Sequence, residues 1–117
     1  MFLVLDRLLL RPNGRKELLR YSRLNENMVP GQDYAQTAGC TANVALITQE
    51  HIYVANAGDS RCVARMTDGR AVDYSVDHKP SVAGEQARIE AAGHTVWNDR
   101  IDGKIAISRA IGDWQFK

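Results

Sequence analysis

The sequence predicts an α+β fold in which helices lead into a set of short antiparallel strands. Phe2, Leu5 and Leu8 recur at helical spacing, and a second helical pattern covers residues 15–24. From residue 41 onward the pattern changes to short apolar runs rich in strand-forming residues, separated by turn residues. This change of period along one short chain is typical of an α+β fold, in which helices and strands occupy separate stretches.

The first ten residues contain the first expected helix. Its apolar face is made of Phe2, Leu5, Leu8 and Leu9. Asp6 and Arg7 are expected to point away from that face. Their charges and the short length of the run argue against both a signal peptide and a membrane span. Pro12-Asn13-Gly14 separates this helix from the one at residues 15–24, and residues 25–36 are expected to form a loop.

Three strands are expected in the middle of the chain, at residues 41–48, 51–57 and 61–66. The turns Gln49-Glu50 and Gly58-Asp59 that join them are so short that successive strands must be antiparallel neighbours. The sequence therefore predicts a three-stranded meander that ends at the turn Asp68-Gly69. Such a sheet with helices on one side keeps one face uncovered and its edges open, which favours a piece of a larger domain.

A short helix is expected after the sheet. Ser81 is its expected N-cap, residues 85–92 form its body, and Gly93 ends it. Short strands are expected at Val96-Trp97 and at residues 104–108, on either side of the turn Asp102-Gly103.

The composition restricts the kinds of partner. The chain has 117 residues, a formal net charge of +1 and 44% hydrophobic residues, which fits one globular domain. Near-zero net charge offers no electrostatic basis for binding nucleic acid or an anionic membrane. Neither Cys40 nor Cys62 has a CxxC partner or a His at a metal-ligand spacing, so both are interpreted as small core residues. These features favour an intracellular protein, cytoplasmic and/or nuclear.

Gly58-Asp59-Ser60-Arg61 is the segment that carries the clearest chemistry. An Asp between two strands is usually a turn former that bonds its own backbone. The functional alternative is a carboxylate at a strand end that offers hard oxygen ligands to a divalent cation. The segment alone does not decide between these readings, but its neighbours along the chain do.

An ordered series of short motifs surrounds this segment. It consists of Gly39-Cys40-Thr41-Ala42, residues 54–61, Asp77-His78-Lys79-Pro80 with Glu85 and Arg88-Ile89, Ala92-Gly93, Arg100-Ile101-Asp102-Gly103 and residues 108–113. In this order and spacing the series closely resembles the protein phosphatase 2C (PPM-type) family of metal-dependent serine/threonine phosphatases. The match covers about residues 39–117, with a looser helical match before it.

The resemblance implies a four-layer αββα sandwich, of which residues 1–117 form a central fragment and about 80–102 a flap beside the active cleft. It implies two or three Mn²⁺ or Mg²⁺ ions in the complete domain. It also implies hydrolysis of phosphoserine and phosphothreonine by a metal-activated water. The family's core metal ligands and its candidate acid His belong to motifs that this chain does not contain. No catalytic residue is therefore expected here, and the 117 residues alone are expected to be inactive.

Several residues take specific roles from the resemblance. Asp59 matches an Asp that binds a further, weaker metal in some members. In the flap, Arg100 resembles an Arg that meets substrate phosphate or acidic side chains. Trp97 is either an exposed anchor for a regulatory protein or a residue packed on the helix at 85–92. Gly58, Arg109 and Asp113 are expected to be structural or to lie beside the cleft, with Arg109 and Asp113 bracing their turn. Three histidines, His51, His78 and His94, are expected to be non-catalytic, with His51 and His94 facing solvent.

Three functions compete at this stage. The first is a segment of an active phosphatase that acts on phosphoserine and phosphothreonine proteins. The second is a non-catalytic phosphatase-like scaffold or adaptor. The third is an independent small α/β binding domain. The ordered motifs argue against the third, and the retained Asp59 favours the first over the second.

Overall fold

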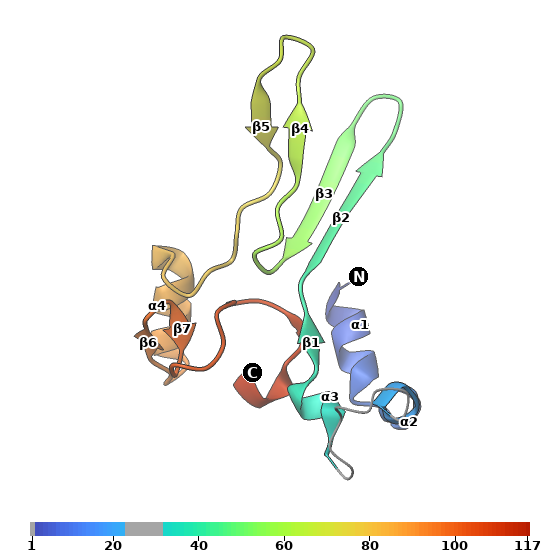
Figure 1. Ribbon diagram of the computed structural model, residues 1–117, viewed down its shortest axis with the longest axis vertical. Helices are drawn as coiled ribbons and strands as arrows, with labels where there is room; N and C mark the ends of the chain where they lie inside the picture. The colour runs from blue at the N-terminus through green and yellow to red at the C-terminus, as the bar shows by residue number, and fades with distance from the viewer. Residues whose placement is uncertain (1, 23–31) are drawn as a thin grey trace. The chain divides into compact units, whose positions relative to one another are not determined.

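Helices and short antiparallel strands form separate groups along the chain in a computed structural model that describes residues 2–22 and 32–117 (Figure 1). The helices are α1 (Phe2–Leu9), α2 (Pro12–Ser22), α3 (Tyr34–Thr37), α4 (Ala83–Ala91) and a 3₁₀ turn, η1 (Trp114–Phe116). The strands are β1 (Gly39–Cys40), β2 (Ala42–Ile47), β3 (Ile52–Ala57), β4 (Val63–Arg65), β5 (Ala71–Asp73), β6 (Val96–Trp97), β7 (Arg100–Ile101) and β8 (Ile111–Gly112). The predicted α+β class is confirmed.

The chain forms two compact units. The first comprises residues up to Cys40 together with Ile111–Lys117, and the second comprises Thr41–Ala110. Strands β1 and β8 pair within the first unit, with Gly39 opposite Gly112. The hairpins β2–β3, β4–β5 and β6–β7 belong to the second unit.

The first unit is held by a buried acid on α1. Asp6 is 7% exposed, so the prediction that it points away from the packed face is wrong. Its Oδ1 accepts hydrogen bonds from the Gly112 backbone N–H at 2.7 Å and from Lys117 Nζ at 2.6 Å. The Asp6 carbonyl accepts from Trp114 Nε1 at 3.2 Å. A buried carboxylate needs such partners, and here they tie α1 to β8 and η1.

The helices of the first unit differ in part from the sequence prediction. α2 begins at Pro12, not at residue 15, because Pro is well suited to the first turn of a helix, where its missing N–H costs nothing. α3 lies in a stretch predicted as loop, and the Asp33 side chain caps it by accepting from the Ala35 N–H at 3.2 Å. The predicted end of the second helix at residues 23–24 and the predicted loop at residues 25–31 lie outside the described part of the chain.

The predicted meander is wrong in one respect. β2 and β3 pair antiparallel as expected, from Ala42 opposite Ala57 to Ile47 opposite Ile52. However, β4 pairs with β5, a strand that the sequence reading missed, and not with β3. The link from Gly58 to Cys62 is long enough to let the chain leave one hairpin and begin another.

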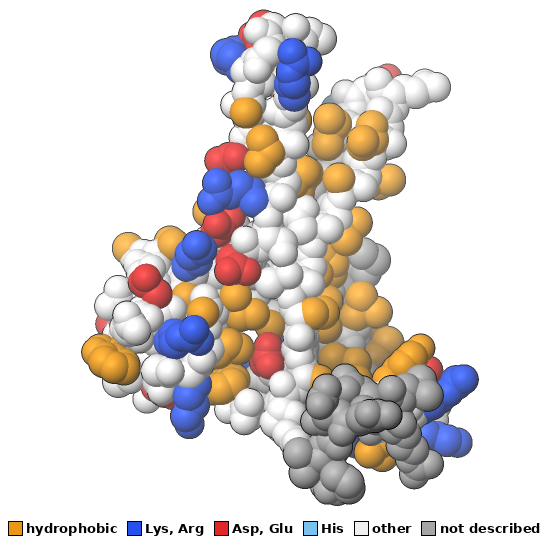
Figure 2. All heavy atoms as spheres, in the orientation of Figure 1, with side chains coloured by type: hydrophobic (Ala, Val, Ile, Leu, Met, Phe, Trp, Pro, Cys, Tyr) orange, Lys and Arg blue, Asp and Glu red, His pale blue; other side chains and the backbone are white. Residues whose placement is uncertain are grey.

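The β2–β3 hairpin carries apolar side chains on both faces and has much exposed hydrophobic surface, visible as orange side chains in Figure 2. Its exposed large residues are Val44, Leu46, Ile47, Ile52 and Tyr53, with Ile47 72% exposed. Hydrophobic residues buried among the described positions are few, namely Ala35, Ile89 and Ile101. Cys40 is exposed and Cys62 half-buried, so the core position predicted for Cys40 is wrong.

α4 follows the prediction closely, but the strand Val96–Trp97 (β6) pairs with Arg100–Ile101 (β7), which the sequence analysis missed, and not with residues 104–108. α4 starts one residue after Val82, which makes no side-chain cap, so the predicted Ser81 cap is wrong. The helix gives way to Gly93, whose φ of 87° lets the His94 N–H return to the Ile89 carbonyl. Asn98 and Asp99 have φ of 51° and 56°, which suits the tight turn of a hairpin. The second run at residues 104–108 forms only a bridge from Ile105 to Ile101.

Candidate functional site

Asp59 lies in the link that follows β3, directly after Gly58. Its side chain is half-buried, and no hydrogen bond or ion pair joins its carboxylate to other described residues. By contrast, Asp77 and Asp102 of the same unit are paired, with Arg61 and His94 respectively. As far as the described residues are concerned, the Asp59 oxygens are therefore available to a cation or to a hydrogen-bond donor.

Gly58 sets the direction in which Asp59 leaves the strand. Its φ of 108° lies in a region that side chains disfavour, and a Cβ there would overlap the Thr41 side chain. The Gly58 N–H donates to His78 Nδ1 at 3.2 Å. The Gly58 carbonyl accepts from the His78 N–H and from Asn56 Nδ2, both at 3.0 Å. A buried glycine with all its backbone groups bonded gives the turn one conformation.

A polar network inside the hairpin supports this turn. Asn43 and Asn56 face each other across β2 and β3, with Asn43 Nδ2 donating to Asn56 Oδ1 at 3.0 Å. Asn43 Nδ2 also lies 3.1 Å from the Ser60 carbonyl and 3.2 Å from Ser75 Oγ. The hydroxyls of Thr41 and Ser60 are 2.7 Å apart. The residues on either side of Asp59 are thus bonded to both strands.

Arg61 closes the link with an ion pair. Its Nε and Nη2 donate to the two Asp77 oxygens at 2.9 and 2.8 Å. This two-point contact raises the pKa of Arg61 and lowers the pKa of Asp77, in each case chiefly through the hydrogen bonds between them. Arg61 and Asp77 line a shallow groove together with Tyr74, Lys79 and Val82. Because Arg61 is already paired, it positions the loop and is not a free anion-binding group.

A second charged cluster joins α4 to residues 108–109. Glu85 is 7% exposed and accepts from Arg109 Nη2 at 2.6 Å and from Arg88 Nη2 at 2.9 Å. The Arg109 contact, helped by Arg88 and opposed by burial, lowers the pKa of Glu85 to about 2. Arg88 also donates to the Ser108 carbonyl at 2.7 Å. Arg109 therefore does not brace its own turn, as the sequence reading expected, but binds an acid 24 positions earlier.

Arg109 belongs to the second compact unit, whereas Asp113 belongs to the first. The φ of Asp113 is 50°, and a Cβ at Gly39 would overlap its carboxylate. Burial raises the pKa of Asp113, with Lys117 acting in the opposite direction. Asp113 is packed against the β1–β8 pair.

The predicted flap residues lie on the β6–β7 hairpin. Trp97 is 72% exposed, and its ring would lie 3.4 Å from a Cβ at Gly103. Of the two alternatives for Trp97, the exposed position is the one observed. Arg100 Nη1 donates to the Lys104 carbonyl at 2.7 Å, which fixes the hairpin. His94, expected to face solvent, is half-buried, and its Nδ1 lies 2.7 Å from Asp102 Oδ2. The Thr95 N–H and His94 lower the pKa of Asp102 to about 2.

The residues do not form a complete divalent-cation centre. Across residues 2–22 and 32–117 there is no group of three or more His, Cys, Asp or Glu side chains that could hold a metal ion. The carboxylate of Asp59 offers oxygen ligands of the kind that Mg²⁺ or Mn²⁺ prefers, and no contact with another described residue occupies them.

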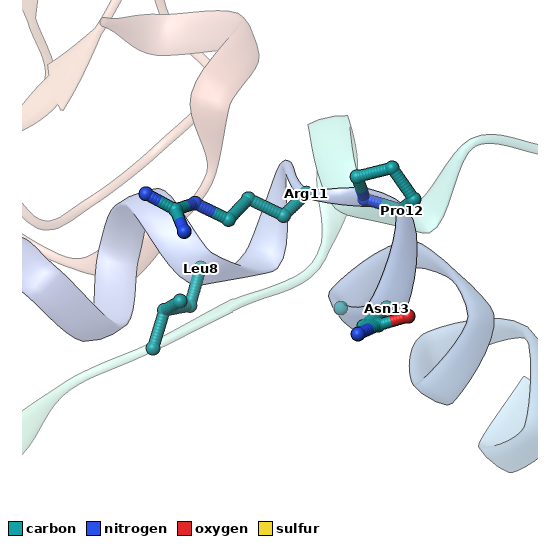
Figure 3. A pocket seen from close by; sticks show the side chains of 5 residues that line it. Leu8, Arg11, Pro12 and Asn13 are labelled. Carbon is teal, nitrogen blue, oxygen red and sulfur yellow. The ribbon is translucent and has the colours of Figure 1, made fainter.

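A separate hollow of about 500 Å³ lies at the junction of α1 and α2 (Figure 3). It is lined by Leu8, Arg11, Pro12, Asn13 and Gly14. Arg11 is its only titratable side chain, so the hollow has no acid–base or nucleophilic pair. None of the described helices is long and apolar enough to cross a membrane.

Comparison with known proteins identifies the family of the chain. The family model described as Protein phosphatase 2C matches residues 5–117. This chain belongs to the protein phosphatase 2C family. Among its relatives, Probable protein phosphatase 2C 4 and Protein phosphatase 2C 1 of Paramecium tetraurelia are each 47% identical to it over 116 residues. Protein phosphatase 2C homolog 2 of Aspergillus fumigatus is 54% identical over 82 residues, which are 70% of this chain and 19% of that relative.

This phosphatase 2C family chain is much shorter than those relatives. The Paramecium matches cover 99% of the chain but only 36% of the relatives, so the chain spans about a third of their length. The family assignment made from the ordered motifs is confirmed.

Sequence reasoning missed the residues that hold the Asp59 turn. Asn43 and Asn56 are polar residues inside strand patterns, and this placement was a usable signal because a polar side chain within a sheet needs partners. Glu85 appeared only as a member of the motif series, and its burial was not predicted. The contact of His78 with Gly58 spans 20 positions and leaves no local pattern.

Proposed function

We propose that this chain is part of a metal-dependent protein serine/threonine phosphatase that hydrolyses phosphoserine and phosphothreonine in proteins. The observation that carries the proposal is the family match over residues 5–117. The free carboxylate of Asp59 on a rigid turn supports it, because a preorganised oxygen ligand is what a catalytic cation centre needs.

In this proposal, Asp59 is the metal ligand that the described residues contribute. Mn²⁺ or Mg²⁺ is the proposed cofactor, and it would polarise the phosphoryl group and activate water. The other ligands are proposed to lie outside the described residues, so the 117 residues alone are expected to be inactive. Arg61, Asn43 and Asn56 hold the turn and do not bind the ion.

Phosphatase activity on a phosphothreonine peptide with added Mn²⁺ tests the proposal. The assay compares the 117 residues with the gene product that carries any flanking sequence. Activity is expected only in the longer protein. Asp59→Asn should lower it by at least about tenfold, since even the outer partners of metal ligands are worth about 10- to 100-fold. Asp68→Asn, an exposed acid on the β4–β5 turn, is the matched control and should leave activity unchanged.

Each outcome separates the alternatives. Inactivity of the longer protein would refute the enzyme proposal and favour the phosphatase-like scaffold. Activity of the 117 residues alone would show that the essential ligands lie within this chain, contrary to the proposal.

A regulatory or substrate protein is proposed to contact the β6–β7 hairpin through Trp97. The support is the 72% exposure of its side chain on a hairpin stiffened by Arg100 and Asp102. Trp97→Ala should lower kcat/KM on a phosphoprotein and leave the hydrolysis of p-nitrophenyl phosphate unchanged. Equal loss on both substrates would contradict the proposal. An intracellular location, cytoplasmic and/or nuclear, is also proposed, and a fluorescent fusion seen only outside the cell would refute it.

A further inference from the structure

His78 lies in the segment after β5 and is hydrogen-bonded to Gly58, the residue before Asp59. Its backbone N–H donates to the Gly58 carbonyl at 3.0 Å, and its ring Nδ1 accepts from the Gly58 N–H at 3.2 Å. One residue thus bonds both backbone groups of Gly58. The His78 carbonyl accepts from the Ser108 N–H at 3.1 Å, which anchors His78 in turn.

The ring contact has a defined chemistry. A backbone N–H can only donate, so Nδ1 of His78 must present a lone pair, and the ring proton must lie on Nε2. Asn is the residue that best imitates this arrangement, because its Oδ1 accepts from a position close to that of Nδ1. Gln and Ala do not offer an acceptor at that place.

Gly58 immediately precedes Asp59, so a rotation of the peptide at Gly58 moves the carboxylate. Without the ring, the Gly58 carbonyl still has two donors, the His78 N–H and Asn56 Nδ2. Loss of the ring therefore frees the Gly58 N–H while the rest of the turn stays bonded. The change should loosen the direction of Asp59 and leave the hairpin folded.

We propose that His78 is a positioning residue, which fixes the Asp59 carboxylate for the reaction through its hydrogen bond with the Gly58 N–H. The inference rests on the proposed phosphatase function. His78 touches neither substrate nor cofactor, and it acts only through Gly58 and Asp59. Its role is thus distinct from that of Arg61, whose ion pair with Asp77 braces the far side of the link.

Activity of the full gene product gives the first test. His78→Ala should lower kcat by about tenfold with little change in KM, the lower end of what partners that orient a functional ligand contribute. His78→Asn should restore kcat to within about threefold of wild type, because the acceptor returns. His51→Ala is the matched control, since His51 is exposed and far along β3 from the turn, and it should retain wild-type kcat.

A double-mutant cycle separates positioning from mere stabilisation. If His78 acts through Asp59, then His78→Ala in an Asp59→Asn background should cause no further loss of kcat. Losses that multiply in the double variant would overturn the proposal. Failure of His78→Asn to restore kcat, with the variant folded, would also overturn it.

A spectroscopic measurement tests the hydrogen bond independently of activity. In ¹⁵N-labelled full gene product, a coupling across the hydrogen bond should connect the Gly58 amide nitrogen with an unprotonated His78 Nδ1. Absence of this coupling, or a protonated Nδ1, would overturn the proposal.

The outcomes distinguish the positioning role from the proposed function. An inactive wild-type protein with the coupling present would refute the proposed function, and with it any catalytic consequence of the hydrogen bond. An active protein with multiplying losses would refute the positioning role alone.

Discussion

Glu85→Gln removes the charge that holds Arg88 and Arg109 against α4 while keeping the size of the side chain. The folded protein lowers the pKa of Glu85 from 4.5 to about 2. At about 1.4 kcal/mol per pKa unit, this difference corresponds to roughly 3 kcal/mol. Both arginine side chains are 50% exposed, so solvent screening reduces the contribution. We expect the substitution to lower the free energy of unfolding by about 1–2 kcal/mol at pH 7.

The pH dependence follows from the direction of the pKa change. Because folding lowers the pKa of Glu85, its stabilisation is fully present above about pH 4.5 and is lost as the pH falls toward 2. Urea unfolding of the full gene product at pH 7 and pH 3 measures this. The gap between wild type and Glu85→Gln should be smaller at pH 3 than at pH 7.

The control for this experiment is Glu90→Gln on the same helix. Glu90 is exposed, and its hydrogen bond from Gln86 at 2.7 Å can be kept by an amide oxygen. Its substitution should change stability by no more than about 0.5 kcal/mol. Equal stability of Glu85→Gln and wild type at pH 7, or a gap of the same size at both pH values, would refute the reasoning.

Substitutions at two further residues, one in each unit, probe the packing. Gly58→Ala should destabilise the second unit by about 1–3 kcal/mol, because φ is 108° and the new Cβ would meet Thr41; a melting temperature equal to that of wild type would contradict this. Asp6→Ala should cost about 1–3 kcal/mol in urea unfolding, because the buried Gly112 N–H loses its acceptor. Asp6→Asn should cost less, since its amide oxygen can still accept from Gly112 although the ion pair with Lys117 is lost; the reverse order of the two variants would count against this account.

The sequence was sufficient for the features that are local. Strands β2 and β3, the strand at Val96–Trp97 and the glycine that ends α4 all follow from short-range rules of helix, strand and turn formation. The family also followed, because several short motifs in order carry more information than any one of them. The direction of the chain after Gly58 did not follow, since a link of this kind suits both a meander and a new hairpin.

The features that sequence reasoning missed depend on contacts between distant positions. Asp6 was assigned to the outside of its helix as a charged residue beside an apolar face. Its hydrogen-bond partner Gly112 lies 106 positions away, so no local pattern indicated its burial. His78 and Gly58 are separated by 20 positions, and Glu85 and Arg109 by 24. Helical and strand periodicity report only on neighbours along the chain, so they cannot reveal which acid or imidazole finds a partner after folding.

The β2–β3 hairpin has a practical consequence for work with the 117 residues. Leu46 and Ile47, on opposite faces of one strand, are 60% and 72% exposed. A hairpin with exposed apolar side chains on both faces can bind another copy through either face. Its self-association therefore continues beyond a dimer. We therefore expect the degree of association of the isolated 117 residues to depend on protein concentration, salt and time.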